Sequence, residues 1–139
     1  MRFTKLNSDK FVWINTGKYA VNWDKKVGSK FQFEVKKFFY PFWKRNIVCE
    51  EFRIPGSLLR IDLVNLTTRM IVEANGEQHE NYNPHFHQGS KNVYLNQIKR
   101  DVAKFEWAKK NNFLFIEIEP KDLPLTREFI FDKYNIKLI

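Results

Sequence analysis

The sequence is poor in the residues that hold small secreted domains together. It contains one cysteine, Cys49, so no internal disulfide can form, and the chain fits a reducing compartment or indifference to redox conditions. No repeat, linker or low-complexity tract divides it. No secretory signal and no apolar run long enough to cross a membrane is present. We therefore expect an intracellular, cytoplasmic protein with no membrane association.

Acidic residues are also scarce relative to basic ones. The sequence has 24 Lys and Arg against 16 Asp and Glu, for a formal net charge of +8. Such an excess favours a polyanionic partner, because clustered Lys and Arg gain affinity by releasing counterions from nucleic acid. The common alternative is that the charge serves solubility alone. The 139 residues, which include 14 Phe and 4 Trp, suffice for one domain with a sizeable core.

The centre of the sequence has the pattern of a β-hairpin. Two runs rich in Ile, Leu and Val, residues 59–65 and 69–75, are separated by three residues. A tight loop centred between residues 67 and 68 places Asp62 opposite Glu73 and Arg60 opposite Asn75. Side chains in such positions lie about 5 Å apart. The other face then carries an apolar set suited to a helix or core beneath it: Ile61, Leu63, Val72 and Ala74.

Two opposed acids destabilise a sheet unless a cation or a proton relieves their repulsion. Mg²⁺ is a suitable cation, since it binds one or two carboxylates and completes its shell with water and substrate phosphate. Two alternatives remain open. Arg60 could neutralise Glu73, or the hairpin could lie at the surface with one solvated face.

Residues 1–28 alternate aromatic and polar groups, which predicts one or two short strands or an irregular arm. The segment could hold a nucleic-acid backbone and stack on bases, or it could simply cover an edge of the core. The residues that suggest the first function are Lys10, Trp13, Lys18, Tyr19, Trp23, Lys25 and Lys26.

A first helix is expected from a cap at Ser29 to about Trp43, with Pro41 bending or ending it. Gln32 and Glu34 lie on opposite shoulders of its apolar stripe. Either could lean toward the element on which the helix packs, although solvation is the default for both. The stripe consists of Phe31, Val35, Phe38, Phe39 and Phe42.

Residues 47–54 read as a strand that precedes the hairpin, and a helix is expected at 91–110. Asp101 falls in the middle of the predicted buried face of this helix and Gln97 at its edge. An acid there requires a partner, and a salt bridge to another element is the simplest one. The predicted buried face is Tyr94, Ile98, Phe105 and Ala108.

The three histidines do not have the spacing of a structural zinc site, since the one cysteine is far away in a strand. Residues 113–119 predict a further strand, central and parallel to a neighbour because a long helix precedes it. Residues 125–134 predict a last helix. The expected order is helix, three strands, helix, strand, helix, which is an α/β fold with a mixed central sheet flanked by helices.

This order, with Asp62 in the second strand and Glu73-Ala74-Asn75 in the third, resembles the core of the PD-(D/E)xK nuclease superfamily. The fuller string RIDLVN...IVEANGEQHE...FH...QIKRDVAKFEWAKKNNFLFIEIE is similar to a branch that contains phage homing-type endonucleases and relatives of the very-short-patch repair endonuclease. The resemblance implies a restriction-endonuclease-like core at 29–119. It also implies one nuclease domain over 1–139, with an arm at 1–28 and a C-terminal helix at 120–139.

The resemblance further implies that Asp62 and Glu73 bind Mg²⁺, for which Mn²⁺ can substitute, and that the carbonyl of Ala74 completes the protein's ligands. No organic cofactor is implied. The position of the family's lysine holds Asn75, which cannot act as a cation or transfer a proton.

Three other residues could take over the role of that lysine. Gln78 and His79 fill the place of a Gln-His pair that several relatives carry, and a histidine can accept a proton from water at neutral pH. Lys104 could instead reach in from the second helix as a cation.

The polar residue that the family carries on the first helix corresponds to Gln32 or Glu34, and Asp101 corresponds to an acid that holds a basic residue of the site. The residues expected to contact DNA are Arg60, Lys91, Arg100 and Lys104.

The sequence thus predicts a Mg²⁺-dependent DNA endonuclease. A catalytically inactive nucleic-acid-binding module on the same fold and a nuclease acting on RNA are the alternatives. One small domain suits a homodimer that cuts both strands, and equally a monomeric nickase.

Overall fold

The computed structural model describes residues 1–76 and 91–139, including the side chains of all these residues except 91–94. The predicted order of helix, three strands, helix, strand and helix is confirmed, and two short strands precede it. The elements are β1 (Arg2–Thr4), β2 (Phe11–Trp13), the 3₁₀ turn η1 (Thr16–Tyr19), α1 (Lys30–Trp43), β3 (Val48–Arg53), β4 (Arg60–Asn65), β5 (Met70–Ala74), α2 (Lys91–Lys110), β6 (Leu114–Ile118), the 3₁₀ turn η2 (Pro120–Asp122) and α3 (Arg127–Tyr134).

The main sheet is mixed and has the strand order β3-β4-β5-β6. β3, β4 and β5 are antiparallel neighbours, whereas β6 runs parallel to β5. The predicted parallel strand is therefore confirmed, but its predicted central position is wrong, because in the described sheet β6 pairs only with β5 and forms an edge. At this edge the hydroxyl of Tyr134 donates to the carbonyl of Glu117 over 2.6 Å and accepts from its N–H over 3.0 Å.

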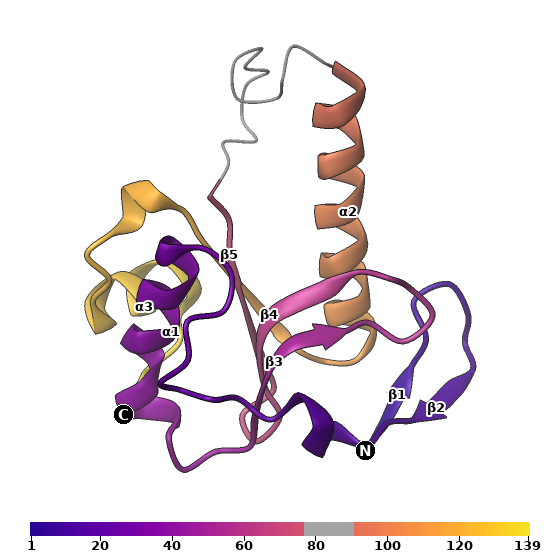
Figure 1. Ribbon diagram of the computed structural model, residues 1–139, viewed down its shortest axis with the longest axis horizontal. Helices are drawn as coiled ribbons and strands as arrows, with labels where there is room; N and C mark the ends of the chain where they lie inside the picture. The colour runs from indigo at the N-terminus through magenta and orange to yellow at the C-terminus, as the bar shows by residue number, and fades with distance from the viewer. Residues whose placement is uncertain (77–90) are drawn as a thin grey trace.

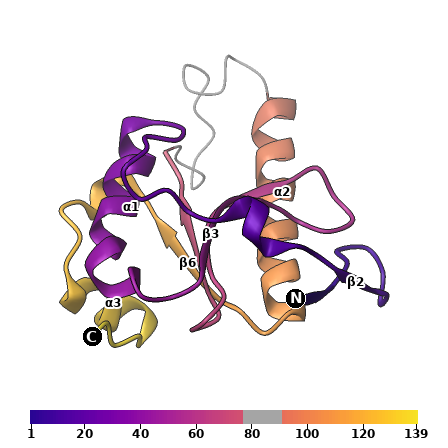
Figure 2. The same ribbon diagram turned by 60° about the horizontal axis from the view of Figure 1, so that its bottom comes forward.

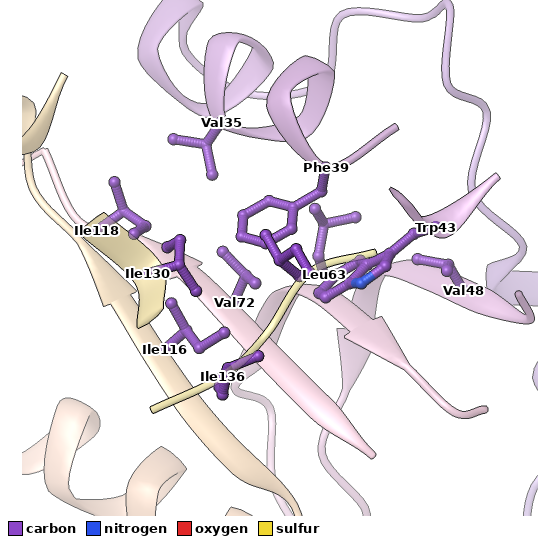
Figure 3. Packing of buried hydrophobic residues seen from close by; sticks show 11 residues of the cluster. Val35, Phe39, Trp43, Val48, Leu63, Val72, Ile116, Ile118, Ile130 and Ile136 are labelled. Carbon is purple, nitrogen blue, oxygen red and sulfur yellow. The ribbon is translucent and has the colours of Figure 1, made fainter. Parts of the chain in front are cut away.

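Helices cover both faces of the main sheet. α1 and α3 lie on one side and α2 on the other, as Figures 1 and 2 show from two directions. The α1 side holds a core cluster that Figure 3 shows from close by, in which Val35, Phe39 and Trp43 meet residues of the sheet and Ile130 of α3. A second cluster on the α2 side contains Trp107.

α1 begins and ends where its sequence predicts. The hydroxyl of Ser29 accepts the N–H of Gln32 over 3.1 Å, which caps the helix. Pro41 lies inside the last turn, where it removes one helical hydrogen bond, and the helix ends at Trp43. Val35, Phe39 and Trp43 of α1 are buried against the sheet, while Phe31, Phe38 and Phe42 of the predicted stripe are partly buried.

A buried ion pair fixes the N-terminal segment against α1. The Lys36 ammonium lies 2.7 Å from Oε1 of Glu50 in β3 and donates to the carbonyls of Asn22 and Lys25 over 2.7 and 2.6 Å. Lys36 is only 4% exposed. With three acceptors around its ammonium, the charge is compensated although it is removed from water.

The predicted hairpin register is confirmed. Leu63 pairs with Val72, and the next two pairs toward the turn follow the same register. The turn is stabilised by Asn65, whose Oδ1 accepts the N–H groups of Thr67 and Thr68 over 3.0 Å each.

The predicted apolar face of the hairpin is wrong at one position. Leu63 and Val72 pack on the α1 side, and Ala74 contacts the same cluster. Ile61, however, packs on the α2 side with Phe52 of β3. The alternation of side chains shifts near residues 51 and 62, where Glu51 adopts a left-handed φ of 49°.

α2 spans the predicted residues, but its predicted buried face is wrong at Phe105, which is 51% exposed. Ala108 is fully buried as predicted, and Trp107, which was not predicted, is fully buried as well. The Trp107 indole N–H donates to the carbonyl of Thr4 over 2.9 Å, so the N-terminal strand determines which side of the helix is covered. Tyr94 lies outside the described side chains.

The first 28 residues cover an edge of the core, as one interpretation of the sequence held. β1 and β2 form a two-stranded antiparallel sheet, and Phe3 is buried against Phe52 and Trp107. In the described part of the chain, no helix is both long and apolar enough to cross a membrane.

Candidate functional site

The hairpin, β6 and α2 enclose a cavity of about 390 Å³. Eight residues that the sequence singled out line it together: Asp62, Glu73, Ala74, Asn75, Gln97, Arg100, Asp101 and Lys104. Side chains separated by as many as 42 positions in the chain therefore converge at one place on the α2 side of the sheet.

Asp62 holds the end of β5. Its Oδ2 accepts the N–H of Ala74 over 2.8 Å. The backbone of β4 pairs with that of β5 from the turn as far as Leu63 and Val72. Beyond that point, the contact of Asp62 with Ala74 holds the two strands together. Asp62 and Ala74 are thereby fixed beside Glu73.

Glu73 is a buried acid in the cavity, with 8% of its surface exposed. The pKa of Glu73 is raised to about 9, mainly by burial and further by the Asp62 carboxylate, against the opposing effect of Lys104. The Lys104 ammonium lies 2.9 Å from Oε1 of Glu73. The contact is therefore an ion pair, since that oxygen makes no hydrogen bond of good geometry among the described residues.

The two alternative interpretations of the hairpin do not hold. Glu73 is buried and both faces of the sheet carry a core cluster, so the hairpin is not a surface element with one solvated face. Arg60 pairs in register with Arg53 of β3, and the recorded ion pair of Glu73 is with Lys104. The cation beside the two acids thus comes from α2.

Glu117 is a cavity residue that sequence reasoning missed. It lies opposite Glu73 in the parallel register of β5 and β6, and its Oε1 accepts the amide of Asn75 over 2.8 Å. The alternation of apolar and acidic residues in FLFIEIE places Glu117 on one face of β6. Which residue of β5 stands beside it depends on a long-range pairing that the local sequence does not contain.

α2 contributes two polar residues besides Lys104 and Arg100. Gln97 and Asp101 line the cavity, as their predicted positions at the edge and the middle of one helix face require. Oε1 of Gln97 is buried without a hydrogen-bond partner among the described residues. An acceptor in that state favours a donor or cation that enters the cavity from outside.

The two candidates from α1 lie outside the cavity lining. Glu34 is exposed, beside Lys37 and Leu125 at a surface groove. The amide of Gln32 donates to Oε1 of Glu51 over 2.8 Å, on the α1 side of β3. The described structure therefore brings neither residue to Asp62 and Glu73.

Gln78, His79, His85 and His87 lie outside the described residues, as does the side chain of Lys91 at the start of α2. In the ranges that the structure describes, no group of three or more His, Cys, Asp or Glu residues is arranged to hold a metal ion. The donors expected from the sequence are the carboxylates of Asp62 and Glu73 and the carbonyl of Ala74, and the carboxylates of Asp101 and Glu117 line the same cavity. Hard oxygens of this kind suit Mg²⁺, which takes few protein ligands and retains water.

Comparisons with known proteins give two viral relatives. The chain is 32% identical over 99 residues to uncharacterized protein 033L of Invertebrate iridescent virus 3, which covers 68% of this chain and 50% of that protein. It is 38% identical over 68 residues to uncharacterized protein 307L of Invertebrate iridescent virus 6, which covers 48% of this chain and 34% of that protein. The chain thus spans half or less of the length of these relatives. No family model and no solved structure matches the chain.

Proposed function

We propose that the chain is a Mg²⁺-dependent DNA endonuclease that hydrolyses phosphodiester bonds, on a restriction-endonuclease-like core. One observation carries the proposal: Asp62, Glu73 and Lys104 come from three different elements and meet in one cavity. Neighbouring carboxyl groups repel each other unless a cation or a proton relieves the repulsion, and a basic residue beside them suits an anionic substrate.

The residues of the site have separable tasks in this proposal. Asp62 and Glu73 would hold the ion, with the carbonyl of Ala74 as a third ligand. When bound, Mg²⁺ would polarise the scissile phosphate and lower the pKa of a water molecule. Lys104 neutralises charge that develops on the phosphate, and its contact with Glu73 keeps the ammonium in the cavity.

The substrate is proposed to be DNA because basic residues lie beside these acids. Arg100 lines the same cavity, and Arg60 precedes Asp62 by two positions in β4. Cations at these positions would contact the phosphates that flank the scissile one. A homodimer would cut both strands, whereas a monomer would nick one.

Supercoiled plasmid DNA tests the proposal directly. The purified protein is expected to relax or linearise the plasmid with Mg²⁺ or Mn²⁺ and not with EDTA. Asp62→Asn and Glu73→Gln are expected to abolish this cleavage while circular dichroism shows an intact fold. Full cleavage by both variants would refute the site, and preferential cleavage of single-stranded RNA would replace the substrate class.

A second function is favoured by one observation. Asn75 stands where the resembled family has lysine, and its amide is engaged by Glu117. A module that binds nucleic acid without cutting it would need no lysine there. Salt-dependent DNA binding by the parent protein without any nicking, at all concentrations of Mg²⁺ and Mn²⁺ tested, would favour this function.

A further inference from the structure

A second groove, of about 450 Å³, lies between the N-terminal segment and the connection from β3 to β4. Figure 1 shows this connection extending toward β1 and β2, and the N–H of Leu6 donates to the carbonyl of Pro55 over 3.0 Å. Three of the residues that line this groove are cationic, namely Lys5, Lys18 and Arg53, and none of the described lining residues is acidic. We call it the basic groove.

Arg53 connects the basic groove to the strand that carries Asp62. Arg53 and Arg60 are direct cross-strand partners in the β3–β4 ladder, and both side chains are exposed. Like charges directly opposite each other destabilise a sheet. A bound anion between the two guanidinium groups would relieve this repulsion.

The geometry leaves donor groups for such an anion. Nε of Arg53 donates to the carbonyl of Ser57 over 2.9 Å, which fixes the side chain beside the groove. The two terminal nitrogens of the guanidinium are the part of an arginine that binds an oxyanion in bidentate fashion. Arg60 is followed two positions later by Asp62, which lines the cavity.

We infer that Lys5, Lys18, Arg53 and Arg60 form a phosphate-binding track that holds the nucleic-acid backbone and guides it into the cavity of Asp62 and Glu73. The track extends the basic residues of the site to the groove beside the N-terminal segment. It rests on the proposed function for the identity of the polyanion, and its contacts are with phosphates, so it confers affinity without base sequence preference.

The track can be measured by binding alone. A fluorescently labelled DNA duplex of random sequence is titrated in EDTA, in which no cleavage occurs, at several salt concentrations. The double variant Arg53→Gln/Arg60→Gln should bind more weakly, and the slope of log K against log salt should become less steep by about 2, since each lost phosphate contact contributes about 0.9. Lys5→Gln/Lys18→Gln should behave in the same way.

Lys44→Gln/Arg45→Gln is the matched control, since it removes two exposed positive charges at the C-terminal end of α1. The N-terminal end of α1 is the one that approaches the cavity, near Gly76. Its slope should equal that of the parent. The inference would be overturned if the track variants kept the parental slope of log K against log salt. It would also be overturned if the control lost as much slope as the track variants. Stronger binding of polyglutamate than of DNA would assign the groove to an acidic protein partner instead.

Cleavage kinetics separate this inference from the proposed function. At saturating protein and Mg²⁺, Lys5→Gln/Lys18→Gln should retain the parental single-turnover rate within about threefold, while the protein concentration for half-maximal rate rises at least tenfold. Asp62→Asn should do the opposite, with binding retained and cleavage lost. If the parent binds DNA through the track but never cleaves it, the track stands and the nuclease proposal fails.

Discussion

The side-chain amide of Asn75 at the end of β5 donates a hydrogen bond of 2.8 Å to the carboxylate of Glu117 in β6. The amide thus faces an acid at the position where the resembled family carries a lysine. The contact connects β5 with β6 beside the acids of the cavity. The stability of the protein should therefore depend on the charge of the side chain at residue 75.

Asn75→Asp should destabilise the protein by about 1–3 kcal/mol at pH 8, because two carboxylates would replace the hydrogen bond. The loss should shrink as the pH falls and one of the acids becomes protonated. Asn75→Lys should not show this loss, since an ammonium beside Glu117 is favourable. Urea unfolding measures both variants, and Asn7→Asp, at an exposed position, serves as the control. Equal stability of the Asp and Lys variants would contradict the contact.

Glu73 should make the metal-free protein less stable as the pH rises. The pKa of Glu73 is raised to about 9 in the folded chain from an ordinary value of 4.5, so between these values only the folded state retains the proton. The contribution of Glu73 to the stability of the fold is therefore fully present below pH 4.5 and declines as the pH rises toward about 9. Thermal unfolding in EDTA at a series of pH values should show this decline in the parent.

Glu73→Gln should flatten that pH dependence and raise the melting temperature of the metal-free protein at pH 8. Glu106→Gln replaces an exposed acid of α2 and should leave the parental pH dependence intact. An unchanged slope in Glu73→Gln would show that Glu73 is ionised in the folded state, contrary to the effect of its burial.

The proposed roles of Lys104 and His79 lead to different expected cleavage kinetics. Lys104→Met should reduce the single-turnover cleavage rate about a hundredfold without changing the shape of the pH profile, because it removes a fixed charge near the phosphate. His79→Ala should lose both rate and a titration step near the imidazole pKa of about 6.5 if this histidine is the general base.

Lys99→Met replaces an exposed lysine on the same helix and is the control for both variants. Parental rates and an unaltered profile in both Lys104→Met and His79→Ala would mean that neither residue replaces the missing lysine.

Lys36→Met should reduce the free energy of unfolding by about 3–5 kcal/mol, because it leaves the Glu50 carboxylate without its buried cation. Lys37→Met, at the exposed neighbouring position, should change it by about 0.5 kcal/mol or less. Replacing Lys36 and Glu50 together by Met and Leu should recover part of the loss. Urea denaturation measures all three, and equal stability of Lys36→Met and Lys37→Met would refute the role of the pair.

Local patterns predicted the elements and the hairpin, because their causes are local. The cap at Ser29 and the turn around Asn65 act within a few residues, and they determine where α1 begins and how Leu63 meets Val72. Lys104 could be recognised as a candidate because it lies one helical turn beyond Arg100.

The remaining features depend on contacts between distant segments. The N-terminal strand covers Trp107 and leaves Phe105 exposed, and the shift near Glu51 sends Ile61 to the other core cluster. Glu117 reaches the site through the parallel register of β6. No property of these single residues predicts such arrangements, since each depends on which strand or helix arrives beside it.

The hydroxyl of Tyr134 has a consequence for association. An edge strand ordinarily offers its unpaired N–H and C=O groups to a strand from another molecule, which is a common route to aggregation. At Glu117 both groups are already bonded to Tyr134. A foreign strand could pair along the whole of β6 only by displacing this side chain, so α3 protects the open edge of the sheet from growth. Tyr134→Phe should retain the fold, because Phe keeps the ring of Tyr134, but it should expose this edge to strand addition.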